Sequence, residues 1–562
     1  MSESMMPSDP VELEIFKHLF ASIAEEMGGR LMRSAYSPNI KERRDFSCAV
    51  FDADARMIAQ AAHIPVHLGS TPMSVEAVLQ VFPAAEMKEG DCFVLNDPFA
   101  GGTHLPDITV VAPCLLPGES TPRFFVANRA HHADVGGLTP GSMPLSRDIS
   151  EEGVRISPRR LDDACIEWIC SQSRTPDERR GDLLAQTAAL HIGKRRMLEL
   201  CERYSAENVS AQALALQAYT ERLIRRVIED IPDGEYTFED RLDGDGFEAE
   251  DIRIHVRLEI RGSRAVVDFT AADDQVAGPV NAVRAIAISA VNYVFQCLAP
   301  DDIPSNAGVM GPIEVETRPG SIVDALPPAA VAGGNVETSQ RIVDVLFGAL
   351  SKALPSVIPA ASCGSMNNIT LGGFDSRRGR PFAYYETLAG GAGGGPSGPG
   401  ASAVHTHMTN TLNTPVEALE HAYPFRIEHY KVHSGSGGRG YHAGGDGVRR
   451  CYVFDSEALA EQPLELTLLT ERRKHAPYGV QGGEPGMRGQ NILYVPGGSG
   501  GENLPSKCTL QLQTPSTKLE IVTPGGGGWG VDASTDGLQV RGHADAESSP
   551  CSDRIEQETK RS

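Results

Sequence analysis

The sequence lacks any uninterrupted apolar run close to the roughly 18 residues that a membrane helix needs. Residues 1–10 contain no basic stretch followed by an apolar one, so nothing there predicts secretion. The 11 cysteines form no CxxC pair and have no repeated spacing, which argues against a disulfide framework and against a thiolate zinc knuckle. We therefore expect a soluble, cytoplasmic protein.

Positive charge and nucleotide-binding motifs are scarce as well. A formal net charge of −23 repels polyanions, so nucleic acid is not an expected partner. No GxxxxGK[ST] loop occurs, which removes the simplest route to nucleotide binding. The GxGxxG match at Gly435 leads into a strand-like segment, and no helix follows the GxSxG match at Gly497, so neither predicts a dinucleotide site or a nucleophile elbow.

The residues that are present predict a large globular chain. Its 562 residues, 41% hydrophobic and 22% charged, are enough for two to four packed units. Apolar residues recur every fourth position from Ile15 to Leu31 and predict a helix, whereas residues 252–260 alternate as in a half-buried strand. We predict a mixed α+β fold, with mixed or antiparallel sheets flanked by helices. The expected units are an N-terminal α/β unit (1–175), a helical segment (176–232), an α+β middle unit with a glycine-rich loop (233–400), a β-rich unit (401–535) and a disordered tail (536–562).

Two polar clusters stand next to predicted strands of the N-terminal unit. His104 and Asp107 close the glycine-containing loop 96–107, and the pair His131 and His132 follows the apolar run 124–127. Strand ends are where catalytic side chains gather. Imidazole and carboxylate ligands suit zinc, manganese or iron. Simple hydrogen-bonding roles remain the alternative, because HxxD and HH are short and common patterns.

Further residues extend this candidate site. Asp45, at the entrance of the predicted strand 46–51, is a possible fourth ligand, while His63 and His67 are expected to orient the ligands by hydrogen bonds. The glycine-rich segment 390–395, which includes Gly393 and Gly394, exposes many backbone N–H groups that could hold a phosphate. A flexible loop is the alternative there.

Eight ordered blocks together resemble the hydantoinase B/oxoprolinase family. This family is the B-type component of ATP-dependent cyclic-amide hydrolases and is related to the large subunits of acetone and acetophenone carboxylases. The resemblance covers nearly the whole chain. Its blocks are ERRDFSCAVFDADARMIAQ from Glu42, HIPVHLGS from His63, NDPFAGGTHLPDITVV from Asn96, NRAHHADVGGLTPGSMP from Asn128, and later RGDLLAQ, GGNVETSQR, ETLAGGAGGGPSG and HTHMTNTLNTPVE.

The resemblance implies a divalent metal held by Asp45, His104, Asp107 and His131, with His132 as the alternative to His131. It also implies an A-type partner that binds ATP and phosphorylates the carbonyl oxygen of the substrate. The missing nucleotide loop would then lie on that partner, and we expect a hetero-oligomer of A and B subunits.

A working mechanism follows from this resemblance. The partner phosphorylates a hydantoin, lactam or oxoproline-like carbonyl, and the metal activates the water that attacks the same carbon. Asp134 or Glu386 is the expected general base. Arg43, Arg44 and Arg129 are the expected phosphate ligands. Two alternatives stay open, namely ATP-dependent carboxylation of a ketone and a non-catalytic scaffold for the A subunit.

Overall fold

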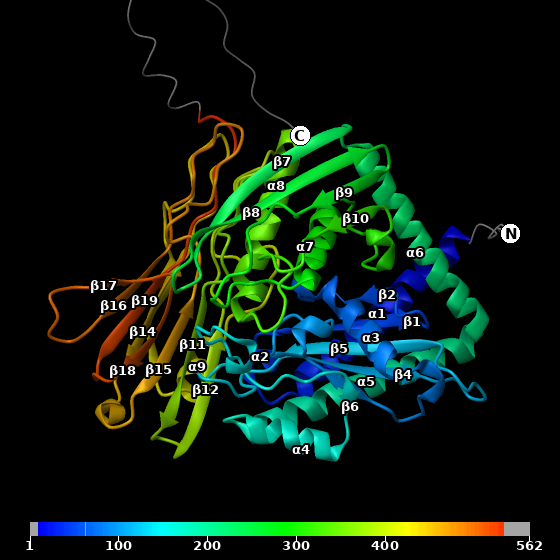
Figure 1. Cartoon of the computed structure of the whole chain (residues 1–562), viewed down its shortest axis with the longest axis horizontal. Coiled ribbons are helices and arrows are strands. Elements are labelled where there is room, and N and C mark those ends of the chain that lie inside the picture. Colours follow the sequence, from blue (N-terminus) through cyan, green and yellow to red (C-terminus); the bar gives the residue numbers. More distant parts are fainter. Residues whose placement is uncertain (1–8, 62, 533–562) are drawn as a thin grey trace, which may run out of the picture.

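The computed structural model describes residues 9–61 and 63–532. It confirms a mixed α+β fold with four sheets, flanked by helices in the first two-thirds of the chain and rich in strands in the last third (Figure 1). Among the described residues, no helix combines the length and the apolar character that crossing a bilayer requires. The tail expected at residues 536–562 falls outside the described part of the chain.

The first sheet is six-stranded and antiparallel, in the order β2-β1-β5-β4-β3-β6. Alternate residues of β5 serve its two faces: Val126 packs into the core with helices α1 and α5, and Phe125 packs with α3. The strands are β1 (Phe46–Asp52), β2 (Met57–Gln60), β3 (Phe93–Leu95), β4 (Asp107–Cys114), β5 (Phe124–His131) and β6 (Arg159–Arg160).

The helices expected around this sheet are present. The four-residue periodicity forms α1, whose Ile23, Met27 and Leu31 are buried, although Ile15 at its start is 46% exposed. The N-terminal half also contains short turns that position the loops. The elements are α1 (Pro10–Ser34), α2 (Pro38–Lys41), η1 (Pro65–His67), α3 (Ser70–Val81), η2 (Ala84–Glu86), η3 (Pro98–Ala100), η4 (Ile149–Glu151), α4 (Asp163–Gln172), α5 (Pro176–Tyr204) and α6 (Ala206–Glu229).

The second sheet, of order β10-β9-β8-β7, carries helix α8 against β7 and β8. The predicted alternation appears in β8, where Ile252, Ile254 and Val256 are buried between less buried neighbours. Strands β9 and β10 form a parallel pair, and the other pairs are antiparallel. The elements are β7 (Gly234–Gly244), β8 (Glu250–Arg261), β9 (Arg264–Asp268), α7 (Arg284–Cys297), η5 (Ala307–Met310), β10 (Ile313–Glu316), the π-helical turn η6 (Gly334–Thr338) and α8 (Ser339–Ala353).

The C-terminal third is β-rich, as predicted. Two antiparallel sheets, β12-β11-β15-β18 and β13-β14-β19-β16-β17, share one core that includes Leu371 and Leu466 from the first and Tyr452 and Leu519 from the second. The elements are β11 (Asn368–Asp375), β12 (Arg380–Glu386), α9 (Val416–Ala422), β13 (Arg426–Val432), β14 (Val448–Phe454), η7 (Glu457–Ala460), β15 (Leu464–Leu469), β16 (Gln490–Tyr494), β17 (Glu502–Leu504), β18 (Lys507–Leu512) and β19 (Thr517–Val522).

The buried apolar side chains of the described residues form three clusters, one of them on the α3 face of the first sheet. One cluster of buried side chains extends from Leu13 to Leu350 and takes in Met408 and Leu469, and a separate cluster joins the two C-terminal sheets. The first cluster includes residues on both sides of 175/176 and 232/233, and helices α5 and α6 pack on each other and on α1. The division into units stays a prediction.

Candidate metal centre

Three neighbouring strands of the first sheet bring acidic and imidazole side chains together. Asp45 immediately precedes β1, His131 ends β5 and Asp107 begins β4. The His131 N–H donates to the Asp45 carbonyl at 3.0 Å, and Asp107 is the register partner of His131. Because alternate residues of a strand face the same side, all three side chains project from the sheet face that carries α3. The strand predicted to end near residue 127 continues to His131, since β1 and β4 pair with it on both sides.

His104 reaches the same place from the loop between β3 and β4. Gly101 has a φ of 86°, and a Cβ on it would lie 2.4 Å from a backbone oxygen of α3, so only glycine fits this turn. The buried Asn96 side chain holds the returning arm by donating to the Leu105 carbonyl at 2.7 Å. The loop therefore places His104 directly beside Asp107.

His104, Asp107 and His131 form a compact buried cluster. Asp107 Oδ1 lies 3.1 Å from His104 Nε2 and 3.2 Å from His131 Nδ1, and none of the three residues is more than 2% exposed. One ligand atom from each residue lies within 4.8 Å of the others. Ligands about 2.0–2.2 Å from one ion are separated by roughly 3.0–3.4 Å, which matches these distances.

The electrostatics of the cluster favour an ionised Asp107. Burial opposes its charge, but the charge of His104 and hydrogen bonds from His104, His131 and His67 outweigh burial and hold the Asp107 pKa well below its usual value. Burial also disfavours the charged form of His104, yet the Asp107 carboxylate raises the His104 pKa. For His131, burial dominates and lowers the pKa.

The donor set fits a divalent metal ion. His104 Nδ1 lies 3.3 Å from the Ala332 carbonyl and so carries a proton, which directs Nε2 toward the Asp107 carboxylate. Only a proton or a cation between these two atoms relieves their repulsion. In the described part of the chain, the buried His131 Nε2 has no hydrogen-bond partner. An ion bound by imidazole and carboxylate would satisfy this set, and zinc, manganese and iron accept such ligands.

Two further side chains orient the cluster. His67, from η1, presents Nε2 at 3.4 Å from Asp107 Oδ2 while its Nδ1 lies 2.8 Å from Ser47 Oγ, which agrees with the orienting role expected for it. Asn335, on η6, places Nδ2 at 3.0 Å from His104 Nε2 and 3.4 Å from Asp107 Oδ2. Asn335 was not predicted, because its position in the GGNVETSQR block carries no recognisable ligand spacing.

Asp45 lies across a very small cavity from this cluster. The cavity, about 20 Å³, is lined by Asp45, Asp107 and His131 and by Tyr385 from β12. Arg43 stacks over the Tyr385 ring at 4.7 Å and reaches Asp45 Oδ2 at 3.6 Å. Asp45 is thus placed to face an ion held by the other three residues, while Arg43 partly neutralises its carboxylate. A space this small holds an ion or a water molecule.

His132 points away from the cluster. It follows His131 on the opposite side of the chain, and its Nε2 lies 2.9 Å from Gln186 Oε1 on α5. Burial lowers the His132 pKa to about 4, so its ring is neutral and serves as a core hydrogen-bonding group. Of the two adjacent histidines, the structure brings only His131 to Asp107.

This arrangement predicts opposite results for the two histidines. His131→Ala should weaken metal binding by roughly 100-fold or more, because even groups outside the ligand shell are worth 10- to 100-fold. His132→Ala should keep the metal but lower the free energy of unfolding by about 1–3 kcal/mol, since it leaves Gln186 without its partner. Titration of the full chain with Zn²⁺ or Mn²⁺, together with thermal unfolding, measures both. Equal metal affinity in the two variants would contradict the assignment.

Arg129 does not face the cavity at the cluster. Its guanidinium donates to Thr109 Oγ1 at 2.8 Å, to Ser74 Oγ at 2.8 Å and to Ser70 Oγ, so it fastens α3 to the sheet. Burial lowers the Arg129 pKa to about 10, against the opposing effect of Asp107. All its donors point at protein oxygens, which leaves little capacity for the phosphate expected there.

The two expected general bases also lie apart from the cluster. Asp134 is buried, pairs with Arg174 at 3.1 Å and accepts the Gly136 N–H at 2.9 Å. Glu386 pairs with Arg450 at 2.9 Å. Strand β12 turns Tyr385 toward the small cavity and Glu386 toward the opposite side, as strand alternation requires. Asp134 therefore neutralises the partly exposed Arg174, and Glu386 neutralises the buried Arg450.

The expected phosphate-binding residues are dispersed. Arg43 is buried and donates to the Tyr385 carbonyl at 2.7 Å, whereas Arg44 is exposed and lines a separate surface hollow. The Gly393 N–H donates to Ser362 Oγ at 3.2 Å, and the Gly394 N–H to the Gly527 carbonyl at 2.8 Å. These N–H groups are already used inside the protein, which argues against the anion cradle expected at Gly393 and Gly394.

The fold and the buried cluster define an α+β protein with a His/Asp centre at the ends of three antiparallel strands. Comparison with known proteins identifies the class more closely. Residues 9–532 match the hydantoinase B/oxoprolinase family, so the chain belongs to that family and the resemblance seen in the sequence is confirmed.

Individual relatives show how far the similarity extends. 5-Oxoprolinase 1 of Arabidopsis thaliana is 38% identical over 93% of this chain, and this chain spans only 42% of that protein's length. The crystal structure of an ATP-dependent caprolactamase from Pseudomonas jessenii superposes with a TM-score of 0.84 at 26% identity, covering 94% of this chain and 93% of that one. A nucleotide-free acetone carboxylase shares the fold, with a TM-score of 0.82 at 16% identity over 94% of this chain and 76% of that one.

Proposed function

We propose that this chain is the B-type part of an ATP-dependent cyclic-amide hydrolase, and that His104, Asp107 and His131 hold its divalent metal. The observation that supports this most is the buried His/Asp cluster, in which nitrogens of His104 and His131 lie 3.1 and 3.2 Å from Asp107 Oδ1. Family membership and the 5-oxoprolinase and caprolactamase relatives support the substrate class. The substrate is a hydantoin, lactam or oxoproline-like ring.

The residues of this chain prepare the centre for hydrolysis. Asp107 stays ionised because three imidazoles surround it, and Ser47 and Asn335 fix the His67 and His104 rings. When bound here, a zinc, manganese or iron ion would act as a Lewis acid and lower the pKa of water toward about 7. The side chains of the cluster are almost fully buried, which strengthens the charge interactions among them.

ATP is assigned to an A-type partner rather than to this chain. The described residues carry no Walker-type loop, and the glycine-rich segment uses its N–H groups internally. The chain corresponds to about two-fifths of the plant 5-oxoprolinase, so that relative has room for a nucleotide-binding part outside the matched region. We propose that the partner phosphorylates the ring carbonyl, which makes the carbon open to attack, and that the two chains form a hetero-oligomer.

The proposal is tested on the complex co-expressed with an A-type subunit. We expect ATP-dependent ring opening of 2-pyrrolidinone, 5-oxoproline or hydantoin in the absence of bicarbonate. Chromatography of the open-chain product and an assay of ADP release measure the reaction. Omitting the A-type subunit should abolish turnover. ATP consumption that requires both a ketone and bicarbonate would instead assign the chain to a carboxylase and refute hydrolysis.

A further inference from the structure

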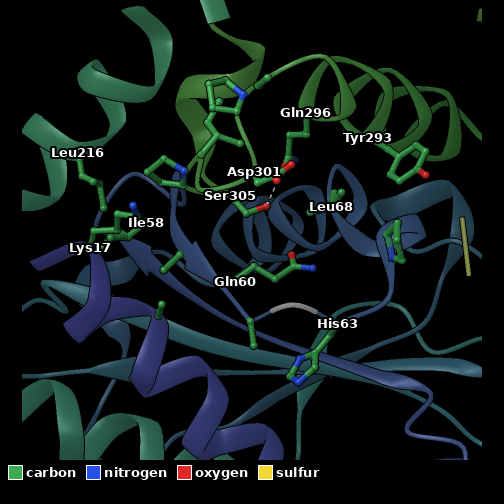
Figure 2. A pocket seen from close by; sticks show the side chains of 18 of the residues that line it. Lys17, Ile58, Gln60, His63, Leu68, Leu216, Tyr293, Gln296, Asp301 and Ser305 are labelled. Carbon is green, nitrogen blue, oxygen red and sulfur yellow. Dashed lines mark hydrogen bonds between the residues drawn. The ribbon is translucent and has the colours of Figure 1, made fainter. Parts of the chain in front are cut away.

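A second cavity, shown in Figure 2, is separated from the small cavity at the metal centre by a shared wall. Its volume of about 490 Å³ falls in the range of small-molecule sites, whereas the 20 Å³ at the cluster is too small for a ring. Strand β2, helix α1 and the end of α7 surround it. The wall between the two cavities is the segment around η1: His63, Pro65 and Leu68 line the large cavity, and Ile64, Val66 and His67 line the small one.

Gln60 is the unexplained residue of this cavity. It ends β2, is only 7% exposed, and extends into the middle of the cavity in Figure 2. Among the described residues, its buried Oε1 has no hydrogen-bond partner. An unpaired buried acceptor costs about 1–3 kcal/mol, so most such atoms in native proteins are paired. The orphaned oxygen therefore points to a ligand that donates a hydrogen bond.

The carboxamide of Gln60 indicates which chemical class of ligand would pair with it. One edge of the Gln60 side chain offers an acceptor, Oε1, beside a donor, the Nε2 amino group. A ring amide is held cis, so its N–H and C=O also lie side by side on one edge, whereas an open-chain secondary amide is almost entirely trans. Building on the proposed function, we propose that this cavity binds the cyclic amide before it reaches the metal centre, and that Gln60 recognises its cis amide edge through two hydrogen bonds.

His63 borders the cavity as a neutral ring whose tautomer is fixed by a backbone hydrogen bond. Its Nδ1 accepts the Cys48 N–H at 3.2 Å, so the neutral ring carries its proton on Nε2. Burial, with a smaller effect of His67, lowers the His63 pKa to about 4, and the ring is a neutral donor at pH 7. A Cβ on Gly28 would lie 2.7 Å from His63 Nε2, so this nitrogen lies against helix α1.

Much of the remaining lining suits an uncharged ring, with the carboxylates of Glu25 and Asp301 also at its edge. Lys17, the one lysine or arginine among the lining residues, already pairs with Glu14 at 3.1 Å and with Asp302 at 3.4 Å. Gln296 accepts a hydrogen bond from Ser305 at 2.9 Å and so is engaged within the protein. Methylene groups of a ring would meet an apolar wall formed by Ile58, Leu68, Leu216, Ala299 and Ile303.

Saturation-transfer NMR on the full chain, with no partner and no ATP, tests this inference. The probes are 2-pyrrolidinone, its N-methyl derivative, which lacks the N–H, and N-methylacetamide, whose amide is trans. We expect 2-pyrrolidinone to bind and both comparison amides to bind at least roughly tenfold more weakly, the effect of losing one or two good hydrogen bonds. Gln60→Met, of similar length but without the amide, should weaken 2-pyrrolidinone binding by a similar factor. Gln511→Met, on the exposed face of β18, is the matched control.

The outcomes separate this inference from the proposed function. Equal binding of the three amides, unchanged binding in Gln60→Met, or no binding to the wild-type chain would each overturn the inference. The melting temperature of Gln60→Met, compared with that of the wild type, shows whether a loss of binding comes from a loss of folding. If Gln60-dependent binding holds but the two-chain complex hydrolyses no cyclic amide, the cavity assignment stands and the proposed hydrolysis fails.

Discussion

Asp107→Asn is expected to abolish ring opening by the two-chain complex, with a loss of at least about 10³-fold in kcat, while the complex still assembles. The asparagine keeps the shape of the side chain and its hydrogen bond from Thr103 Oγ1, which now lies at 2.7 Å from Asp107 Oδ2. It removes the negative charge that His104 and His131 surround. Both metal affinity and the electrostatic stabilisation of a charged transition state depend on that charge.

The measurement must distinguish catalysis from assembly. Metal content, size-exclusion elution with the A-type subunit and the rates of ATP use and product formation are compared for Asp107→Asn and for Asp54→Asn. Asp54 lies in the exposed turn between β1 and β2, so its variant should match the wild type. A scaffold that merely clips the partner would lose assembly or thermal stability in Asp107→Asn but would show no selective loss of product. That result would refute a catalytic centre here.

Much of this centre follows from the sequence because strand pairing is local and regular. Asp107 and His131 begin and end strands whose apolar residues identify them, and antiparallel register then sets the two side chains opposite each other. The choice between His131 and His132 depended on where β5 ends. The apolar run stops near residue 127, but pairing with two neighbours extends the strand, and only then does alternation decide the face.

Other contributions to the centre depend on tertiary structure. Asn335 lies 228 positions from Asp107, and it reaches the cluster because a π-helical turn precedes α8. No local spacing encodes that approach. Asp134 and Glu386 lie away from the cluster for a related reason: Asp134 pairs with Arg174, just before α5, and Glu386 pairs with the buried Arg450 on β14. Charge type and proximity along the chain could not reveal those partners.

The glycine-rich segment shows a different limit of sequence reasoning. Glycine permits a flexible anion-binding loop and also permits close packing of extended backbones. In the structure, backbone hydrogen bonds join the segments that contain Gly393, Gly438, Gly445 and Gly526. A Cβ added to any of these glycines would meet a carbonyl oxygen of a neighbouring segment. Glycine content alone does not distinguish a flexible loop from close packing, because Gly393 packs against distant parts of the chain. Its neighbours include Ala360 and Gly526.

Close packing at these glycines makes a strong stability prediction. A Cβ on Gly393 would lie 1.9 Å from the Ala360 carbonyl oxygen, far inside any allowed contact and against backbone rather than a movable side chain. Gly393→Ala should therefore lower the free energy of unfolding by about 3 kcal/mol or more, through overpacking at a site that has no room to relax. The expected readout is a melting temperature several degrees lower.

Gly398→Ala is the matched control, since Gly398 lies five residues after Gly393 but has no atom within 4 Å of an added Cβ. Its melting temperature should equal that of the wild type or rise slightly, because alanine restricts the unfolded chain. Phosphate should protect neither variant, whereas an anion cradle at Gly393 would make wild-type stability depend on phosphate. Equal melting temperatures for the two variants would show that the backbone around Gly393 can move to accept a Cβ. That result would support the flexible loop that glycine content by itself predicts.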